Sequence, residues 1–160
     1  MKSLRINGII EESIVDGPGI RFVIFTQGCP HHCPGCHNPQ THAFDTGYFI
    51  DTQELLSKII ENPLLMGVTF SGGEPFSQAE PLAELAKQLH KKGLDIVTYT
   101  GYTLETLYAQ KDPHINTLLL QTDTLIDGPF EQSKRDPALS FRGSTNQRII
   151  DMRHTTPSLH

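Results

Sequence analysis

Three cysteines that lie within eight residues of one another are the part of this chain best suited to chemistry. Cys29, Cys33 and Cys36 have the spacing C-x3-C-x2-C, and the 160-residue sequence holds no other cysteine. Thiolates are the usual ligands of iron–sulfur clusters. Three of them leave one iron of a cubane cluster without a protein ligand, and an open metal position is typical of a site that binds substrate.

Two other uses of the same cysteines are open at this point. Cys33 and Cys36 form a C-x-x-C motif of the thioredoxin type, which gives Cys29 no role. A structural zinc site would take a histidine as its fourth ligand, although such sites usually draw two short motifs from separate segments; the candidates are His31, His32 and His37. The odd number of cysteines argues against a disulfide framework.

The elements that must position these cysteines alternate between strands and helices. Short runs rich in β-branched and aromatic residues predict strands over 20–26, 67–70, 95–100, 124–127 and 147–151. Helical spacing of apolar residues predicts helices over 51–62, 78–92, 104–110 and 115–120. This alternation favours parallel strands joined by crossover helices. A full eight-unit barrel takes about 250 residues. We therefore expect a single α/β domain over 1–160, an incomplete and laterally open (β/α) barrel of about five strands.

Polar or glycine-rich segments follow four of the expected strands, namely the cysteine segment 29–36 and residues 71–74, 101–102 and 127–130. In parallel α/β folds, sites assemble at the carboxyl ends of the strands. These four segments should therefore converge on one rim.

Gly72, Gly73 and Glu74 form one of these segments. The two glycines let a ligand approach bare backbone, and the glutamate can accept a hydrogen bond from an ammonium group. Phosphate-binding, dinucleotide-binding and nucleophile-elbow motifs are missing from the sequence. ATP hydrolysis, nicotinamide chemistry and serine hydrolysis thus lack their usual sequence signals.

Composition and charge exclude several further classes. The chain is 37% hydrophobic and 19% charged, which is typical of a globular protein, and its formal net charge is −5. This charge disfavours nucleic acid and anionic membranes as partners. The sequence shows neither a secretory signal nor an apolar run long enough to span a bilayer, and we expect a cytoplasmic protein.

The cysteine spacing and the Gly-Gly-Glu segment together resemble the radical S-adenosylmethionine superfamily. Residues 16–21, 28–29 and 36–39 are similar to the activating enzymes of glycyl-radical proteins. Further segments look like the branch that activates anaerobic ribonucleoside-triphosphate reductases, namely 33–36, 100–102, 126–130 and 142–148. The match extends from about residue 5 to residue 152.

The resemblance implies a role for each matching residue. Cys29, Cys33 and Cys36 would bind a [4Fe-4S] cluster, whose open iron takes the amino and carboxylate groups of S-adenosylmethionine. The other cofactor contacts would come from Gly35, Cys36, His37, Gly72, Gly73, Glu74 and Asp127. Among these, the backbone of residues 35–37 would contact adenine, because Gly35 stands where many superfamily members carry an aromatic residue. The partner peptide would lie along Asp16, Gly17, Pro18 and Gly19.

The reaction that the resemblance implies is the activation of an anaerobic ribonucleoside-triphosphate reductase. Reductive cleavage of S-adenosylmethionine gives a radical that removes a hydrogen from a glycine on a loop of the reductase, with flavodoxin or ferredoxin as the one-electron donor. The alternatives are the activation of another glycyl-radical enzyme, as in pyruvate formate-lyase activators, and a short radical enzyme acting on a small molecule. The Asp-Thr-Asn-Gly segment often found in pyruvate formate-lyase activators is replaced here by residues 98–101. A zinc-stabilised binding module without catalysis is the alternative from a different class.

Overall fold

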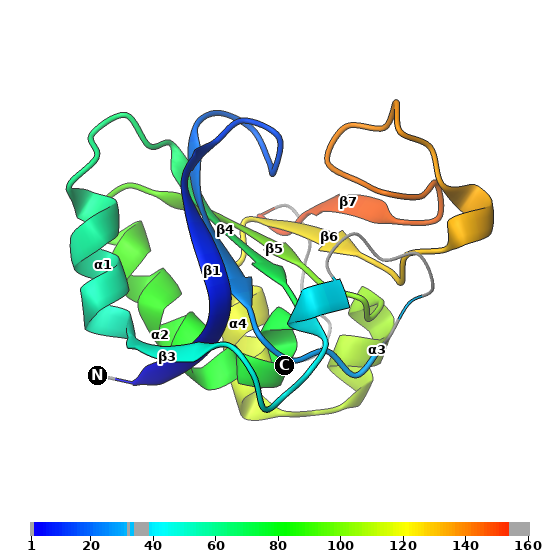
Figure 1. Ribbon diagram of the computed structural model, residues 1–160, viewed down its shortest axis with the longest axis horizontal. Helices are drawn as coiled ribbons and strands as arrows, with labels where there is room; N and C mark the ends of the chain where they lie inside the picture. Colours follow the sequence, from blue (N-terminus) through cyan, green and yellow to red (C-terminus); the bar gives the residue numbers. More distant parts are fainter. Residues whose placement is uncertain (1, 32, 34–38, 154–160) are drawn as a thin grey trace.

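The computed structural model describes residues 2–31, 33 and 39–153, whose strands form one sheet of seven strands (Figure 1). The strands are β1 (Ser3–Ser13), β2 (Arg21–Thr26), β3 (Tyr48–Asp51), β4 (Gly67–Gly72), β5 (Asp95–Tyr99), β6 (Thr124–Asp127) and β7 (Arg148–Asp151). The helices are α1 (Thr52–Ile60), α2 (Ala79–His90), α3 (Leu104–Ala109) and α4 (Pro113–Gln121), with short 3-10 turns η1 (Pro39–Thr41), η2 (Pro75–Gln78) and η3 (Gln132–Lys134).

The sheet is mixed, with the strand order β3-β1-β2-β4-β5-β6-β7. The four central strands β2, β4, β5 and β6 are parallel, as the alternation of strands and helices predicts. The fold is thus an open mixed α/β sheet, and all five predicted strands are present.

The expectation of parallel pairing throughout is wrong at both edges. β7 runs antiparallel to β6, because the segment that joins them holds only the short turn η3 and no crossover helix. β1 and β3, which the sequence analysis did not predict, extend the other edge in antiparallel fashion.

The four helices lie close to their predicted positions, and a polar residue precedes each of them. Asp51 caps α1, with its Oδ1 accepting a hydrogen bond from the Gln53 amide at 2.7 Å. Asp112 caps α4 in the same way, and Pro113 occupies the first turn, where its missing N–H costs nothing.

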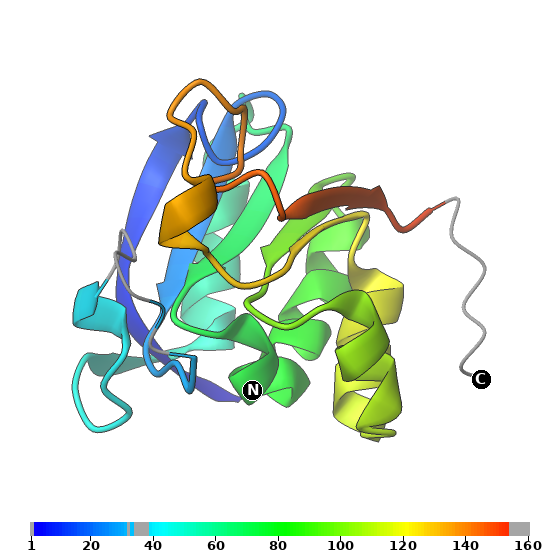
Figure 2. The same ribbon diagram turned by 90° about the vertical axis from the view of Figure 1, so that its right-hand side faces the viewer.

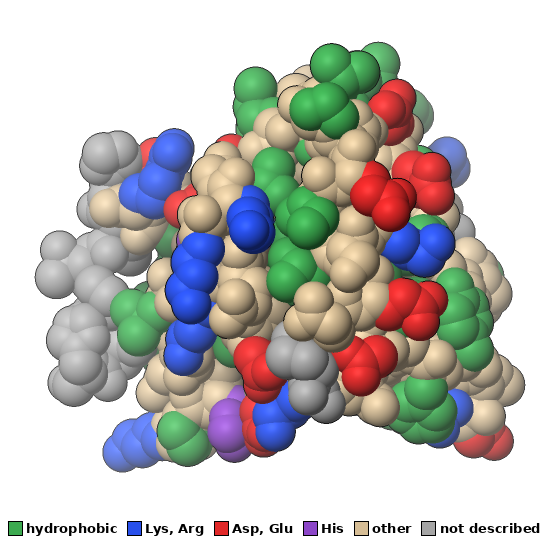
Figure 3. All heavy atoms as spheres, turned by 90° about the vertical axis from the view of Figure 1, so that its left-hand side faces the viewer, with side chains coloured by type: hydrophobic (Ala, Val, Ile, Leu, Met, Phe, Trp, Pro, Cys, Tyr) green, Lys and Arg blue, Asp and Glu red, His purple; other side chains and the backbone are tan. Residues whose placement is uncertain are grey.

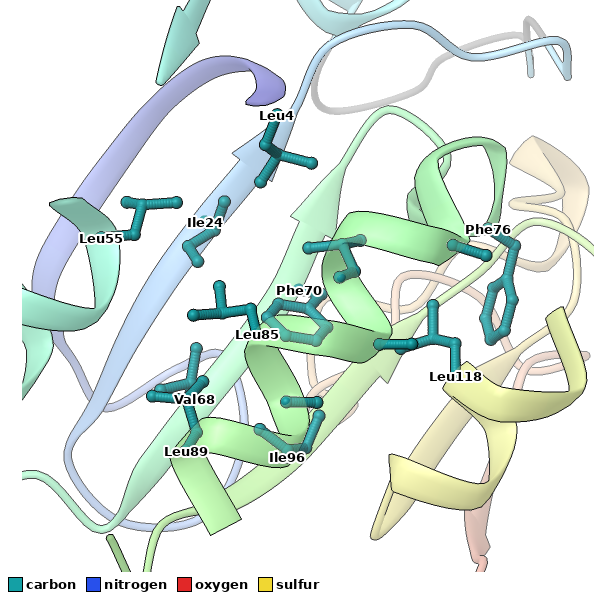
Figure 4. Close-up of a cluster of buried hydrophobic side chains, with 14 of the residues drawn as sticks. Leu4, Ile24, Leu55, Val68, Phe70, Phe76, Leu85, Leu89, Ile96 and Leu118 are labelled. Carbon is teal, nitrogen blue, oxygen red and sulfur yellow. The ribbon is translucent and has the colours of Figure 1, made fainter. Parts of the chain in front are cut away.

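The hydrophobic core lies between the helices and one face of the sheet. Phe70 of β4 packs in this layer with Leu85 and Leu89 of α2, and all three side chains are fully buried (Figure 4). Alternate residues of the same strands point to the opposite face. Figures 1 and 2 show α1, α2 and α4 together on the core side of the sheet. One face of the sheet is thus covered by helices, and the other is available for a site.

The fully buried side chain of Arg21 ties the loop before β2 to the central strands. Its Nε donates to Thr69 Oγ1 at 2.8 Å and its Nη1 to the Pro18 carbonyl at 2.9 Å. Its Nη2 donates to the Val68 carbonyl at 3.0 Å and to Asp95 Oδ1 at 2.5 Å. The guanidinium therefore holds three segments that lie far apart in the sequence.

The surface shown in Figure 3, the side on which α1 lies in Figure 1, carries both acidic and basic side chains. Basic groups gather toward one side of this view and acidic groups toward the other, so no single charge covers this face.

Across the described part of the chain, no helix has the length and apolar character needed to cross a membrane.

Replacement of Arg21 tests its role in the fold. Arg21→Met should lower the free energy of unfolding by about 3 kcal/mol, because it leaves buried acceptors without a donor. Urea unfolding followed by circular dichroism measures this change. Arg153→Met serves as a control because Arg153 is exposed, and it should leave the urea midpoint unchanged. An Arg21→Met protein with the wild-type midpoint would contradict the assignment.

Candidate functional site

A cavity of about 600 Å³ opens on the face of the sheet that the helices leave uncovered. Its floor is formed by Ile10 of β1, Phe25 of β2, Ser71 of β4 and Tyr99 of β5. These residues alternate along their strands with core residues such as Phe70, and they therefore point to the other side of the sheet. The volume is within the range of about 300–1,000 Å³ that is usual for ligand sites.

Four predicted segments meet at this cavity, as the strand order requires. The described residues that they contribute are Cys29, His31 and Cys33 from the cysteine segment, Ser71, Gly72 and Gly73 at the end of β4, Gly101 after β5, and Gly128 and Phe130 after β6. The convergence expected from the sequence is confirmed, because the central parallel strands all present their carboxyl ends to one rim.

The cysteine segment begins at the end of β2 and turns directly into the cavity. Gly28 adopts a φ of 108°, a conformation that favours glycine, and its amide donates to the Thr41 carbonyl at 2.7 Å. Cys29 is buried, Cys33 is half-buried, and both line the cavity. Cys36 lies outside the described residues, as do Gly35 and His37. The thiols of Cys29 and Cys33 are soft donors of the kind that bind iron–sulfur clusters or zinc, and they fit such a group.

Gly72 and Gly73 are required by the close approach of two backbone segments. A Cβ on Gly72 would lie 2.5 Å from the amide nitrogen of Thr26, and one on Gly73 would collide with the carbonyl oxygen of Gly28. The Gly73 amide donates to the Thr26 carbonyl at 2.8 Å. These glycines therefore let β4 and the cysteine segment pack together, and they also line the cavity with bare backbone.

Glu74 lies behind this wall and is fully buried. Its carboxylate accepts hydrogen bonds from His31 Nε2 at 2.6 Å, the Gly101 amide at 2.8 Å, Thr100 Oγ1 at 2.8 Å and the Phe76 amide at 3.1 Å. Glu74 is not among the residues that line the cavity. Its contacts join the segments that follow β2, β4 and β5.

Asp127 is also buried and does not line the cavity, whereas its neighbour Gly128 does. Its Oδ2 accepts from the Leu104 amide at 2.7 Å, at the first residue of α3. Its Oδ1 accepts from Arg148 Nε at 2.9 Å, and this bond raises the pKa of the Arg148 guanidinium above its usual range. Through these bonds Asp127 joins β6 to α3 and β7.

The segment 16–19 lies at the rim of the cavity through Asp16. The Asp16 carbonyl accepts from Thr69 Oγ1 at 2.7 Å, and its carboxylate accepts from Ser13 Oγ at 2.6 Å. Gly17 is buried, while Pro18 and Gly19 are exposed. The segment is thus fixed at its base, with an exposed outer edge.

Several residues of the cavity lining were not predicted from the sequence. The segment between β6 and β7 contributes Leu139, Phe141, Arg142 and Gln147 to the cavity. Gln147 Oε1 accepts from the Gly143 and Ser144 amides at 2.8 and 3.1 Å, which closes this segment into a compact turn. The segment 142–148 carried the family resemblance and was the one available signal.

Tyr99 is a further lining residue that the sequence analysis did not single out. Burial is the main cause that raises the pKa of its hydroxyl well above the usual range. The phenol therefore stays protonated at neutral pH and adds no charge to the cavity floor.

Similarity to known proteins distinguishes between an iron–sulfur cluster, a zinc site and a redox pair as the use of the thiols. Residues 15–150 match the family described as a 4Fe-4S single cluster domain. An anaerobic ribonucleoside-triphosphate reductase-activating protein of Salmonella typhi is 36% identical over 149 residues, which cover 88% of this chain and 94% of the relative. A protein of the same name from Vibrio cholerae is 39% identical, covering 85% of this chain and 90% of the relative.

The chain belongs to the family of the anaerobic ribonucleoside-triphosphate reductase-activating proteins. The donor set of this family member therefore fits a [4Fe-4S] cluster. A pyruvate formate-lyase-activating enzyme of Clostridium pasteurianum is 42% identical over 133 residues, but the match covers 79% of this chain and only 56% of that relative. The structure of QueE from Escherichia coli shares the fold, with a TM-score of 0.50 and 22% identity over 63% of this chain and 54% of that one.

Replacement of Asp127 tests its position behind the cavity wall. Asp127→Ala should lower the free energy of unfolding by about 2 kcal/mol, because the Leu104 amide and the Arg148 guanidinium lose a buried acceptor. Glu105→Ala is the matched control, since Glu105 binds the same arginine at the surface. That control should cost less than about 1 kcal/mol. Equal urea midpoints for wild type and Asp127→Ala would refute the assignment.

Proposed function

We propose that this chain activates an anaerobic ribonucleoside-triphosphate reductase by generating a glycyl radical on it. Reductive cleavage of S-adenosylmethionine at a [4Fe-4S] cluster held by Cys29, Cys33 and Cys36 would supply the radical. The observation that carries the proposal is that Cys29 and Cys33 open into one cavity with the glycine-rich segments after three parallel strands. This cavity lies in a chain whose relatives carry the name of that activity.

The residues of the chain would bind, orient and shield the reactants. The bound cluster supplies a low-potential electron for the cleavage of S-adenosylmethionine. Cys29 is buried, and its amide donates a hydrogen bond to the His42 carbonyl at 3.0 Å. Cys33 is half-buried and therefore nearer to solvent. Gly72 and Gly73 would offer backbone to the methionine end. Contacts to adenine from Gly35 and His37 stay predictions, since these residues lie outside the described part of the chain.

The cavity walls are suited to the exclusion of water. Phe25, Phe130, Leu139 and Phe141 line the cavity, and its exposed lining is mainly apolar. A reactive radical needs such surroundings, because water and stray hydrogen donors would intercept it.

The partner would enter at the open rim. Val15 is 70% exposed and lines the cavity together with its neighbour Asp16. Asp16, Gly17, Pro18 and Gly19 would form one side of the channel for the glycine-bearing loop of the reductase. Arg21 fixes this segment from below, so the channel wall has a defined position before the partner arrives.

Several finer features belong to the same proposal. The sheet would curve as an incomplete, laterally open barrel, and flavodoxin or ferredoxin would supply the electron to a cytoplasmic protein. Activation of a pyruvate formate-lyase is the second candidate, favoured by the identity with the Clostridium pasteurianum enzyme. The reductase is preferred because its activators match this chain over nearly their whole length.

The activity can be tested by anaerobic reconstitution with iron and sulfide, followed by mixing with dithionite, S-adenosylmethionine and the reductase. The electron paramagnetic resonance spectrum should then show a glycyl doublet, and Cys33→Ala should lose both the bound iron and the doublet. A parallel sample with pyruvate formate-lyase should stay silent.

Ser57→Ala on the outer side of α1 is the control for this experiment and should keep both iron and doublet. A colourless wild-type protein that binds zinc instead of iron would overturn the proposal and support a zinc-stabilised binding module. A doublet that survives in Cys33→Ala would contradict the assignment of this ligand.

The rim can be tested separately from the chemistry. Val15→Asp should weaken binding of the reductase about tenfold, equivalent to about 1.4 kcal/mol, because it places a charge in an apolar contact. Leu120→Asp is the matched control, since Leu120 is 62% exposed on α4 and does not line the cavity. Surface plasmon resonance under anaerobic conditions measures both affinities. If the two variants bind the reductase equally well, Val15 is not part of the docking surface.

A further inference from the structure

The carboxylate of Glu74 has no acceptor capacity left for a bound molecule. A carboxylate offers about four lone-pair sites. Oε1 accepts from His31 Nε2 and the Gly101 amide, and Oε2 accepts from Thr100 Oγ1 and the Phe76 amide. The side chain is also fully buried. Glu74 therefore acts on the site through the groups that it binds.

His31 is the one among these four donors that lies in the cysteine segment, two residues after Cys29 and two before Cys33. His31 Nε2 lies 2.6 Å from Glu74 Oε1, although the two residues are 43 positions apart in the sequence. Because Glu74 Oε1 accepts the hydrogen bond from the Nε2–H group, this contact fixes both the tautomer and the direction of the ring.

Two further contacts hold the His31 ring in place. Its centroid lies 4.4 Å from that of Tyr102, with the ring planes at 77°, an edge-to-face arrangement that aromatic rings prefer. A Cβ on Gly101 would collide with the same ring. The absence of a side chain at position 101 therefore makes room for His31 between the segments that follow β4 and β5.

We infer that His31 is a positioning residue, which sets the arrangement of Cys29 and Cys33 by anchoring their segment to Glu74. The inference rests on the proposed function, because the cysteines are taken as ligands of the cluster. His31 lines the cavity, yet the ring nitrogen Nε2 is directed to the buried carboxylate. Residues that hydrogen-bond to the segments carrying metal ligands commonly affect metal affinity, and their removal weakens binding of the metal.

A pair of variants that differ by one methylene group tests this role. His31→Gln can place its amide nitrogen where Nε2 lies and can donate to Glu74. His31→Asn carries the same amide but is too short to reach the carboxylate. After anaerobic reconstitution, the loss of iron to a chelator should be about tenfold faster in His31→Asn than in wild type. His31→Gln should restore the wild-type rate to within about threefold.

The spectrum of the dithionite-reduced cluster supplies a second readout, which a loss of stability alone would leave unchanged. The g values of His31→Asn should differ from those of wild type, and those of His31→Gln should match them. His114→Ala controls for loss of a surface histidine and should leave the rate and the spectrum unchanged, since His114 pairs with Glu80 on the helical side.

Glu74→Gln gives an independent route to the same conclusion, because it disturbs the acceptor and leaves His31 in the chain. It should speed the loss of iron, and His31→Asn in the Glu74→Gln background should add little further, as expected for residues that act as one unit. This variant decides the matter if His31→Asn does not fold.

Equal rates and spectra for wild type, His31→Asn and Glu74→Gln would overturn the positioning role and leave the proposed function intact. Additive effects of the two substitutions would also overturn it. Failure of the wild-type protein to bind iron would instead overturn the proposed function itself.

Discussion

The buried carboxylate of Glu74 is the interaction on which the site depends. A buried negative charge is costly unless its acceptor sites are filled, and here the donors come from segments that follow three different strands. Each of these segments is thereby drawn to the same point. The cysteine segment is long and polar, and helix or sheet hydrogen bonds do not fix its described residues beyond Cys29. Its placement relies on contacts such as this one.

The buried guanidinium of Arg21 also joins separate segments, here the central strands and the segment at the rim of the cavity. Arg21 binds carbonyls and side chains of the central strands and, through the Pro18 carbonyl, holds the segment that forms the rim. The two groups have opposite charge and lie at opposite ends of strand β2 and its neighbours. Between them, β4 and β5 present one row of side chains to the helices and the alternate row to the opposite face, where Ser71 and Tyr99 line the cavity. The sheet thus separates a core from a site with a single layer of backbone.

The central strands, the helices and the convergence of the loops were predictable from local patterns. β-branched runs such as 20–26 and capped helices such as that after Asp51 carry strong local signals, and parallel topology then places the loops on one rim. β1 was missed because two register shifts against β2 interrupt its alternation. β3 was missed because it is a four-residue edge strand whose residues are mostly exposed. The burial of Glu74 and Asp127 could not be predicted from the local sequence pattern. A carboxylate in a polar segment can face a ligand or the protein interior, and the choice depends on donors such as His31 and Arg148, which come from distant segments.

The uncovered face of the sheet has a consequence for when the chemistry can proceed. Helices cover one side of the strands, and on the other side the described segments near Val15 and Phe141 line the rim of the cavity. A partner that docks across this rim, as proposed, would cover the open side of the cavity. The apolar walls of this chain would then be completed by the partner, so that a short-lived radical would form where its target is already bound.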